Sequence, residues 1–374
     1  MEVMTIFGPA WDDLALEDID RFLDSAPPEP LLWEAKGDTN AAQQRKQVCG
    51  FANSHEGGFL ILGAHGDGDP WKLDGTTFAK DDPPSAITDV IAGGGVTPYP
   101  EGLDVRSWEV SAGRHAAVVR IPPSATPPCN TNGTVYERVS GKTIPVQDPA
   151  RLAELFARGD AARRSARERA HRAVVAILVL GRTRVPHIQF ALGLAATGYA
   201  PDISSRLFTP HFEAGMRSRM TSLLAALDHH PFGVSTPTRE ITQDALLLEM
   251  EANHQHGDTW SVRASWDGGV AIYWSMAVEQ TVISSVVERP LKAAWACADE
   301  LLGELKPQGP RYLEITVAGG PFPLGPAAVS LPGEPRPAPP TVMRGPLVPG
   351  VDQDTLASIE RELRRAAGEP AFEG

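Results

Sequence analysis

The segment FANSHEGGFLILG, residues 51–63, contains the end of one structural element and most of the next. The stretch AAQQRKQVCGFANS, 41–54, is predicted to form a helix that ends near Asn53 and Ser54, ahead of the glycine pair Gly57-Gly58. The run GGFLILGA, 57–64, is apolar and bounded by glycines, which is typical of a strand covered on both faces. A helix that leads directly into such a strand predicts an α/β domain.

The neighbouring segments supply the other elements of this domain. We expect an amphipathic helix and a short strand, LLWEAK, before it, and a hairpin, another strand and a further helix after it. Asp148 suits the cap of that last helix and Pro149 its first position. The other predicted elements are 11–25, 31–36, 103–121 and 133–139. Residues 1–160 are therefore predicted to form one mixed α/β domain.

The pattern changes after residue 160. Residues 161–172 include ARRSARERAHR and predict an arginine-rich linker helix, while AVVAILVL, 173–180, has the apolar character of a buried strand. Residues 173–320 are predicted to form a second, α+β domain of unknown role. Its expected elements are a helix at 210–227, a hairpin at 259–276, a helix at about 279–305 and a strand at 311–319. The tail, 321–374, is rich in proline and glycine, disfavours regular structure up to about residue 350, and ends in a predicted helix at 352–368.

The composition limits the classes of function. The chain has 374 residues, 34 basic against 47 acidic, and a net charge of −13, which argues against non-specific coating of nucleic acid and requires any polyanion site to be local. Its three cysteines lie far apart, so neither a disulfide framework nor a cysteine-rich zinc site is indicated. The chain lacks an apolar run long enough for a membrane span and a secretory signal pattern, so we expect a cytoplasmic protein with no membrane partner.

Carboxylates follow two strands that are predicted to be close together. Glu29 and Glu34 flank the strand LLWEAK, and Asp67 and Asp69 follow the glycine-bounded strand. If the strand ends are neighbours, three acids converge as a site for Mg²⁺ or Mn²⁺ against a phosphodiester, and Lys36 can stabilise charge on the phosphate. The alternative is an ordinary surface pair of Glu34 and Lys36, with the aspartates solvating a turn, and spacing alone favours it.

Other motifs carry weaker signals. The string G-x-x-x-x-G-K-[ST] of a P-loop is absent, and AGGGVTP, 92–98, is interpreted as a flexible loop. His254, His256 and Asp258 occupy alternate positions that share one face of a strand and could coordinate a metal. Without an evident fourth ligand, a surface turn or strand end is the favoured interpretation.

The order of these segments is similar to that of a known family. The pattern Glu29-x4-Glu34-x-Lys36, then FANSHEGGFLILG, a hairpin, and VYERVSGKT at 135–143 resembles the Schlafen AlbA-2 domain, also described as a DNA-binding domain. The resemblance covers roughly residues 10–155. It implies an α/β domain that binds DNA or RNA, and bacterial proteins of this type are often labelled transcriptional regulators.

The resemblance also implies a catalytic set. Animal Schlafen members cleave structured RNA such as transfer RNA with two glutamates and an aspartate, so it implies Glu29 and Glu34 as catalytic residues and metal ligands, together with Lys36. The aspartate position falls on His65, and Asp67, two residues on, is the expected substitute as catalytic residue and metal ligand. This departure puts cleavage in question more than binding.

A set of basic residues is predicted to contact nucleic acid: Lys36, Arg45, Lys46, Arg138, Lys142, Arg163, Arg164 and Arg167. For Arg138 a structural ion pair is an equal alternative, and for the arginine-rich segment a solvated linker helix is favoured. Asn53, Gly57 and Gly58 suit a tight connection whose backbone amides could meet an anion, or turn geometry alone.

The hairpin at 259–276 concentrates four aromatic residues: Trp260, Trp266, Tyr273 and Trp274. They could form a base-stacking platform, although an aromatic strand more often supplies a core face.

Three functional hypotheses follow. The first is a nucleic-acid-binding protein, for RNA or DNA, that acts in regulation or defence. The second is a metal-dependent endoribonuclease, and the third is a protein-interaction module; a homo-oligomer is left open.

Overall fold

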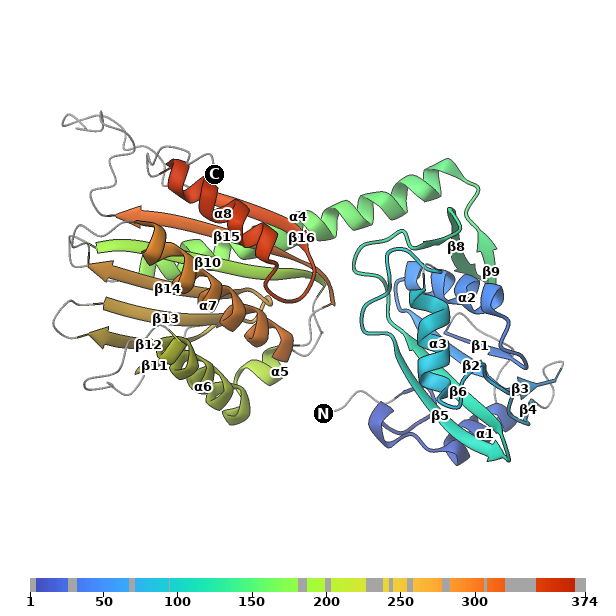
Figure 1. Ribbon diagram of the computed structural model, residues 1–374. Coiled ribbons are helices and arrows are strands. Elements are labelled where there is room, and N and C mark those ends of the chain that lie inside the picture. Colours follow the sequence, from blue (N-terminus) through green and yellow to red (C-terminus); the bar gives the residue numbers. More distant parts are fainter. Residues whose placement is uncertain are drawn as a thin grey trace. The chain divides into compact units, whose positions relative to one another are not determined.

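The computed structural model describes residues 5–25, 32–66, 71–93, 95–180, 187–198, 203–226, 238–241, 245–253, 258–277, 283–305, 308–319 and 341–366. The chain has a mixed α/β fold and divides into two compact units, Met1–Ala162 and Arg163–Gly374 (Figure 1). Within the described residues, no helix combines the length and the apolar character that a membrane crossing needs.

The first unit is built on a four-stranded sheet of order β1-β2-β6-β5. Its strands are β1 (Trp33–Lys36), β2 (Gly58–Leu62), β6 (Arg114–Ile121) and β5 (Asp104–Ser111). The first two strands are parallel, and β2, β6 and β5 are antiparallel neighbours. The predicted helix, buried strand and hairpin are all present, because their glycine boundaries and alternating apolar residues are strong local signals.

Both faces of this sheet are covered. On one face, Leu60 and Leu62 of β2 pack with α2 (Ala41–Asn53) and α3 (Pro83–Ala92). On the other, Ile61 packs with Trp33 and with residues from the 3₁₀ turn Trp11–Asp13 and α1 (Leu16–Ser25). The side chains of a strand alternate between faces, so a continuous apolar strand fills two cores at once.

A smaller three-stranded sheet packs against α2 and completes the first unit. Its strands are β7 (Asn130–Thr131), β8 (Thr134–Val139) and β9 (Lys142–Pro145), and the short pair β3 (Ala64–His65) and β4 (Lys72–Leu73) lies beyond β2. Asn53, fully buried, donates to the carbonyls of Cys129 and Tyr136 and accepts from the Cys129 N–H at 2.6 Å. This side chain therefore ties the end of α2 to the small sheet.

The prediction that residues 173–180 form a strand is wrong. One helix, α4 (Pro149–Leu180), runs through this segment and through the arginine-rich 161–172, which is therefore not a separate linker helix. Ala173, Val174 and Ile177 are buried at helical spacing, whereas Val175 and Val179 are exposed. An apolar run of eight residues cannot by itself distinguish a strand from a buried helix end. The predicted start of this helix is confirmed, since Asp148 Oδ1 accepts from the Ala150 N–H.

The second unit is built on a seven-stranded antiparallel sheet of order β11-β12-β13-β14-β10-β15-β16. The strands are β10 (His187–Gly198), β11 (Thr238–Ile241), β12 (Ala245–Asn253), β13 (Asp258–Ser265), β14 (Val270–Ala277), β15 (Gln308–Gly319) and β16 (Thr341–Leu347). The predicted hairpin and the strand near 311–319 are confirmed. The prediction that proline and glycine keep the tail irregular up to about residue 350 is wrong at β16, because its pairing with β15 outweighs local propensity.

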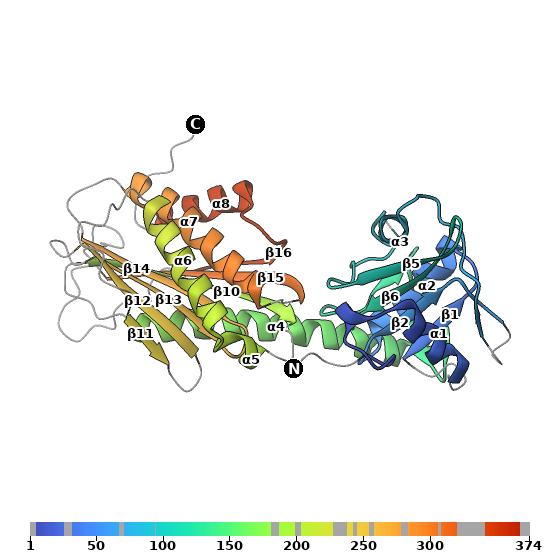
Figure 2. The ribbon, with the colours of Figure 1, turned by 90° about the horizontal axis from the view of Figure 1, so that it is seen from below.

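Helices cover the two faces of this sheet unequally. One face carries the large core with α5 (Ile203–Leu207), α6 (Pro210–Ala226), α7 (Ile283–Glu304) and α8 (Gln353–Ala366). The other carries the C-terminal part of α4, whose Ala173, Val174 and Ile177 pack on Ala191 and Ala271 (Figure 2).

The aromatic hairpin belongs mainly to the large core. Trp260, Trp274 and Phe190 are stacked, with interplanar angles of 7° and 8°, and all three are buried. Tyr273 is also buried, on the opposite face. They are therefore not a surface for bases, and Trp266, in the turn, is the exposed member of the set.

Candidate nucleic-acid interface

Strand β1 carries the candidate site on the face that it turns toward α2. Trp33 and Ala35 belong to the core on the α1 side, so the alternating residues Glu34 and Lys36 lie on the opposite face. Glu34 is buried, while the Lys36 side chain is 32% exposed. The strand thus places a carboxylate inside the unit and an ammonium group at its surface.

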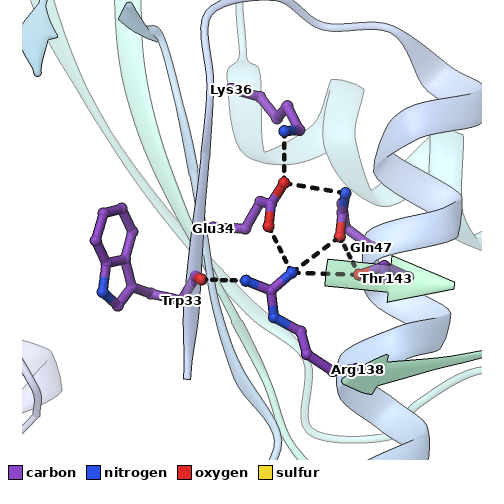
Figure 3. A network of polar contacts seen from close by, with 6 residues as sticks. All are labelled: Trp33, Glu34, Lys36, Gln47, Arg138 and Thr143. Carbon is purple, nitrogen blue, oxygen red and sulfur yellow. Dashed lines mark hydrogen bonds and ion pairs between the residues drawn. The ribbon is translucent and has the colours of Figure 1, made fainter. Parts of the chain in front are cut away.

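Every oxygen of the Glu34 carboxylate receives a donor (Figure 3). Oε1 lies 2.5 Å from Lys36 Nζ and accepts from Gln47 Nε2 at 3.2 Å. Oε2 lies 2.5 Å from Arg138 Nη1. Charge-assisted hydrogen bonds of this kind are the strong ones in proteins, so the carboxylate is held in one position.

Arg138 comes from β8, far away in sequence, and its side chain is fully buried. Its Nη2 donates to the Trp33 carbonyl at 2.6 Å, and its Nη1 donates also to Thr143 Oγ1 at 3.3 Å. The guanidinium lies over the ring of Phe51, 4.6 Å from its centroid. The structure thus gives Arg138 the role of positioning Glu34, which was the alternative interpretation, and its burial keeps it from direct contact with a phosphate.

Gln47 and Thr143 close the network. The Thr143 hydroxyl donates to Gln47 Oε1, whose side-chain amide donates to Glu34. Gly50 lies one turn further along α2, and a Cβ there would be 2.6 Å from Thr143 Cγ2. Glycine at this helical position therefore allows β9 to approach α2.

The cluster formed by Glu34, Lys36 and Arg138 carries two cations against one carboxylate. Elsewhere on α2, Arg45 and Lys46 add positive charge, and the helix contains no acid. Lys46 Nζ lies 5.9 Å from the centroid of the Tyr136 ring, and Arg45 Nε donates to the Val90 carbonyl at 2.8 Å. Cationic side chains thus lie on α2 and at the end of β1, in a chain that is acidic overall.

The remaining predicted basic residues lie elsewhere. Lys142 is exposed, and it pairs with Val139, so both lie on the face of the hairpin away from Arg138 and Thr143. Arg163, Arg164 and Arg167 fall in the part of α4 that belongs to the second unit. There the guanidinium of Arg167 lies 5.1 Å from the centroid of the Tyr312 ring.

The predicted metal site stays a prediction, because two of its three ligands are not among the described residues. Glu29 and Asp67 lie outside them, as do His254 and His256, and no cluster of three His, Cys, Asp or Glu in the described part of the chain could hold a metal ion. Glu34 already has donors on both oxygens. His65 packs against the backbone at Gly37 and lies 3.3 Å, through Nε2, from the Gly75 carbonyl.

The cysteines do not offer a nucleophile. Burial raises the pKa of Cys129 to about 11 and that of Cys297 to about 12, and burial also raises the pKa of Cys49. All three thiols are therefore neutral near pH 7, and inert.

Sequence reasoning missed Gln47 and Thr143 as members of the site. A signal existed for Gln47, because it lies among Gln44, Val48 and Phe51 on the buried face of α2, where a polar residue needs a partner.

Asn53, Gly57 and Gly58, which the sequence singled out at the helix-to-strand connection, have structural roles. Gly57 has a φ of +72°, and a Cβ on Gly58 would be 2.2 Å from an atom of the Phe51 ring. Asn53 acts through its side-chain hydrogen bonds.

Comparisons with known proteins leave the family open. No protein-family model and no curated protein matches the chain. Among solved structures, the chain is similar to the DIP2311 protein from Corynebacterium diphtheriae at 15% identity and a TM-score of 0.27. The match covers 55% of this chain and 34% of that one, and a similarity this low supports no statement about function.

Proposed function

We propose that the first unit binds the phosphate backbone of RNA or DNA next to α2, with Lys36 as the principal contact, and that the protein acts in regulation or in defence against foreign nucleic acid. The observation that carries the proposal is the cluster in which, among the residues that the structure describes, Lys36 and Arg138 both meet the carboxylate of Glu34. Arg138 neutralises Glu34 from inside the unit, so the partly exposed ammonium of Lys36 retains charge for a phosphate oxygen.

The surroundings of Lys36 support an anionic partner. Lys46 on the acid-free helix α2 is half-buried against Tyr136 and is a further candidate contact. A separate contact is proposed at Lys142, which is exposed on the outer face of the β8–β9 hairpin, away from Arg138 and Thr143. Because these contacts are to the phosphate backbone of the nucleic acid, binding should depend on salt and discriminate little between nucleotide sequences.

The test measures binding of transfer RNA, single-stranded DNA and duplex DNA by fluorescence anisotropy as a function of salt. Lys36→Gln should weaken binding to all of them uniformly and reduce the slope of log K against log salt by about one. Lys292 is an exposed lysine on α7 in the second unit. Lys292→Gln removes the same charge and should leave the affinity and the salt slope unchanged. Equal binding by wild type and Lys36→Gln would refute the contact, and salt-independent partner binding without nucleic acid would favour the interaction module.

The same samples, run on a gel with Mn²⁺ or with chelator, test the endoribonuclease hypothesis. Cutting that requires the metal and is lost in Glu29→Ala or Asp67→Ala would show that these carboxylates form a working site. Retention without cutting would leave binding as the activity. Thermal unfolding of each variant, followed by circular dichroism, confirms that a loss of signal is not a loss of fold.

A further inference from the structure

The second unit contains a cavity of about 450 Å³ beside α4. One wall is the exposed side of that helix, with His171, Arg172 and Val175, and the other is the end of β13 and the turn that follows it, with Arg263, Ser265 and Trp266. Small-molecule sites in proteins are usually about 300–1,000 Å³. The cavity is therefore large enough for a ligand the size of a mononucleotide.

Two arginines, Arg172 and Arg263, and one aspartate, Asp267, line the cavity. Asp267 accepts from Ser265 Oγ at 2.6 Å and from Arg172 Nη2 at 2.9 Å. Burial opposes ionisation of Asp267, but these bonds and the Gly269 N–H hold its pKa below the ordinary value, so the carboxylate is charged and Arg172 balances it. Arg263 adds a second guanidinium, and Arg is well suited to phosphate because its N–H groups match two oxygens.

His171 is oriented by a buried carboxylate. Its Nδ1 lies 2.8 Å from Oε1 of Glu314, which is 1% exposed, whereas the imidazole itself is 59% exposed. Because Nδ1 is engaged by Glu314, Nε2 is the nitrogen that a ligand can meet. The imidazole thus stands beside the two arginines with its ring orientation fixed from the sheet.

Trp266 gives the cavity an exposed aromatic wall. Its side chain is 57% exposed, in contrast to Trp260 and Trp274 of the same hairpin, which are fully buried. Val175, 43% exposed, lines the cavity from α4. A large apolar side chain left in water next to a cavity indicates a binding role, and an indole face stacks well on a nucleobase.

We propose that this cavity binds a phosphate joined to an aromatic base, as in a nucleoside monophosphate or the terminal nucleotide of a nucleic-acid strand. The base stacks on Trp266, and the phosphate is held by Arg172 and Arg263. A plain carboxylate would use fewer of these donors, and a bare phosphate would leave the indole uncovered. The inference concerns the second unit alone and does not depend on nucleic-acid binding by the first.

The experiment is a calorimetric titration of the full chain with AMP, adenosine, inorganic phosphate and a 5′-phosphorylated single-stranded oligonucleotide. AMP should bind at least about tenfold more tightly than adenosine or phosphate alone, because each of these lacks one half of the contacts. Trp266→Ala and Arg172→Gln should each weaken AMP binding about tenfold. Tighter binding of AMP than of the oligonucleotide would identify the free nucleotide, and the reverse would identify a strand end.

Matched controls separate this site from others. Phe208→Ala removes an exposed aromatic side chain and Arg361→Gln an exposed charge, both within the second unit, and neither should change AMP binding. Lys36→Gln should also leave it unchanged, so a failure of nucleic-acid binding in the first unit does not affect this result. The proposal is overturned if neither AMP nor the oligonucleotide binds at millimolar concentration, or if Trp266→Ala, still folded by circular dichroism, binds AMP like the wild type.

Discussion

Each unit contains an arginine paired with a carboxylate, but the two pairs differ in burial. In the first unit, Arg138 Nη1 lies 2.5 Å from Glu34 Oε2, and the two side chains are 0% and 6% exposed. In the second unit, Arg172 Nη2 lies 2.9 Å from Asp267 Oδ2, and the two side chains are 60% and 31% exposed. The buried pair cannot lose a partner without leaving a charge in the core, whereas the exposed pair can exchange its partner for water or a ligand. The comparison separates a buried framework pair from a pair that solvent can reach.

The largest expected effect comes from breaking the buried pair. Glu34→Gln should lower the free energy of unfolding by about 3–5 kcal/mol, because it removes the carboxylate charge that meets Arg138 Nη1 inside the unit. Urea unfolding followed by circular dichroism measures it. A loss below about 1 kcal/mol would mean that the pair is no more than a surface ion pair. The result also affects the functional test: a Glu34 variant that loses binding can have lost its fold, so Lys36→Gln is the informative change.

A smaller effect should follow from crowding the same network. Gly50→Ala places a Cβ about 2.6 Å from Thr143 Cγ2, and overpacking of this kind costs about 1–3 kcal/mol, offset by up to about 1 kcal/mol from better helix propensity. The variant should therefore be less stable in urea, although Gly→Ala normally stabilises a helix. Thr143→Ser removes the crowding methyl group and keeps the hydroxyl, so the double variant should recover part of the loss. Simple additivity of the two changes would show that this contact is not the cause.

The comparison also shows which features could be predicted from sequence. The elements around FANSHEGGFLILG were predicted because glycine boundaries and alternation are local signals. The pairing of Glu34 with Arg138 could not be predicted, because Arg138 lies 104 residues away and an ion pair at that separation leaves no pattern in one sequence. The alternative of a structural ion pair for Arg138 was open, but its partner was unknown.

In the second unit the errors have a different origin. The segment 173–180 is as apolar as a strand, and only the face that it buries against Ala191 and Ala271 shows that it is helical. β16 follows a proline-rich stretch and contains Pro346, so local propensity argues against it, while pairing with β15 provides the stabilisation. The cavity between α4 and the end of β13 joins segments about 90 residues apart, and no local pattern in the sequence indicates their contact.

The smallest effect is expected at the exposed pair, where it depends on pH. The pKa of Asp267 in the folded protein lies below its ordinary value of 3.8. Its contribution to the free energy of unfolding is therefore present above about pH 4 and is lost as the pH falls through the folded pKa. Asp267→Asn should therefore cost at most about 1 kcal/mol at pH 7, and the difference from wild type should shrink toward pH 3. Thermal unfolding of both proteins from pH 7 to pH 3 measures it. A loss at pH 7 comparable to that of Glu34→Gln would contradict the comparison, because Asp267 would then support the framework of the second unit, as Glu34 does in the first.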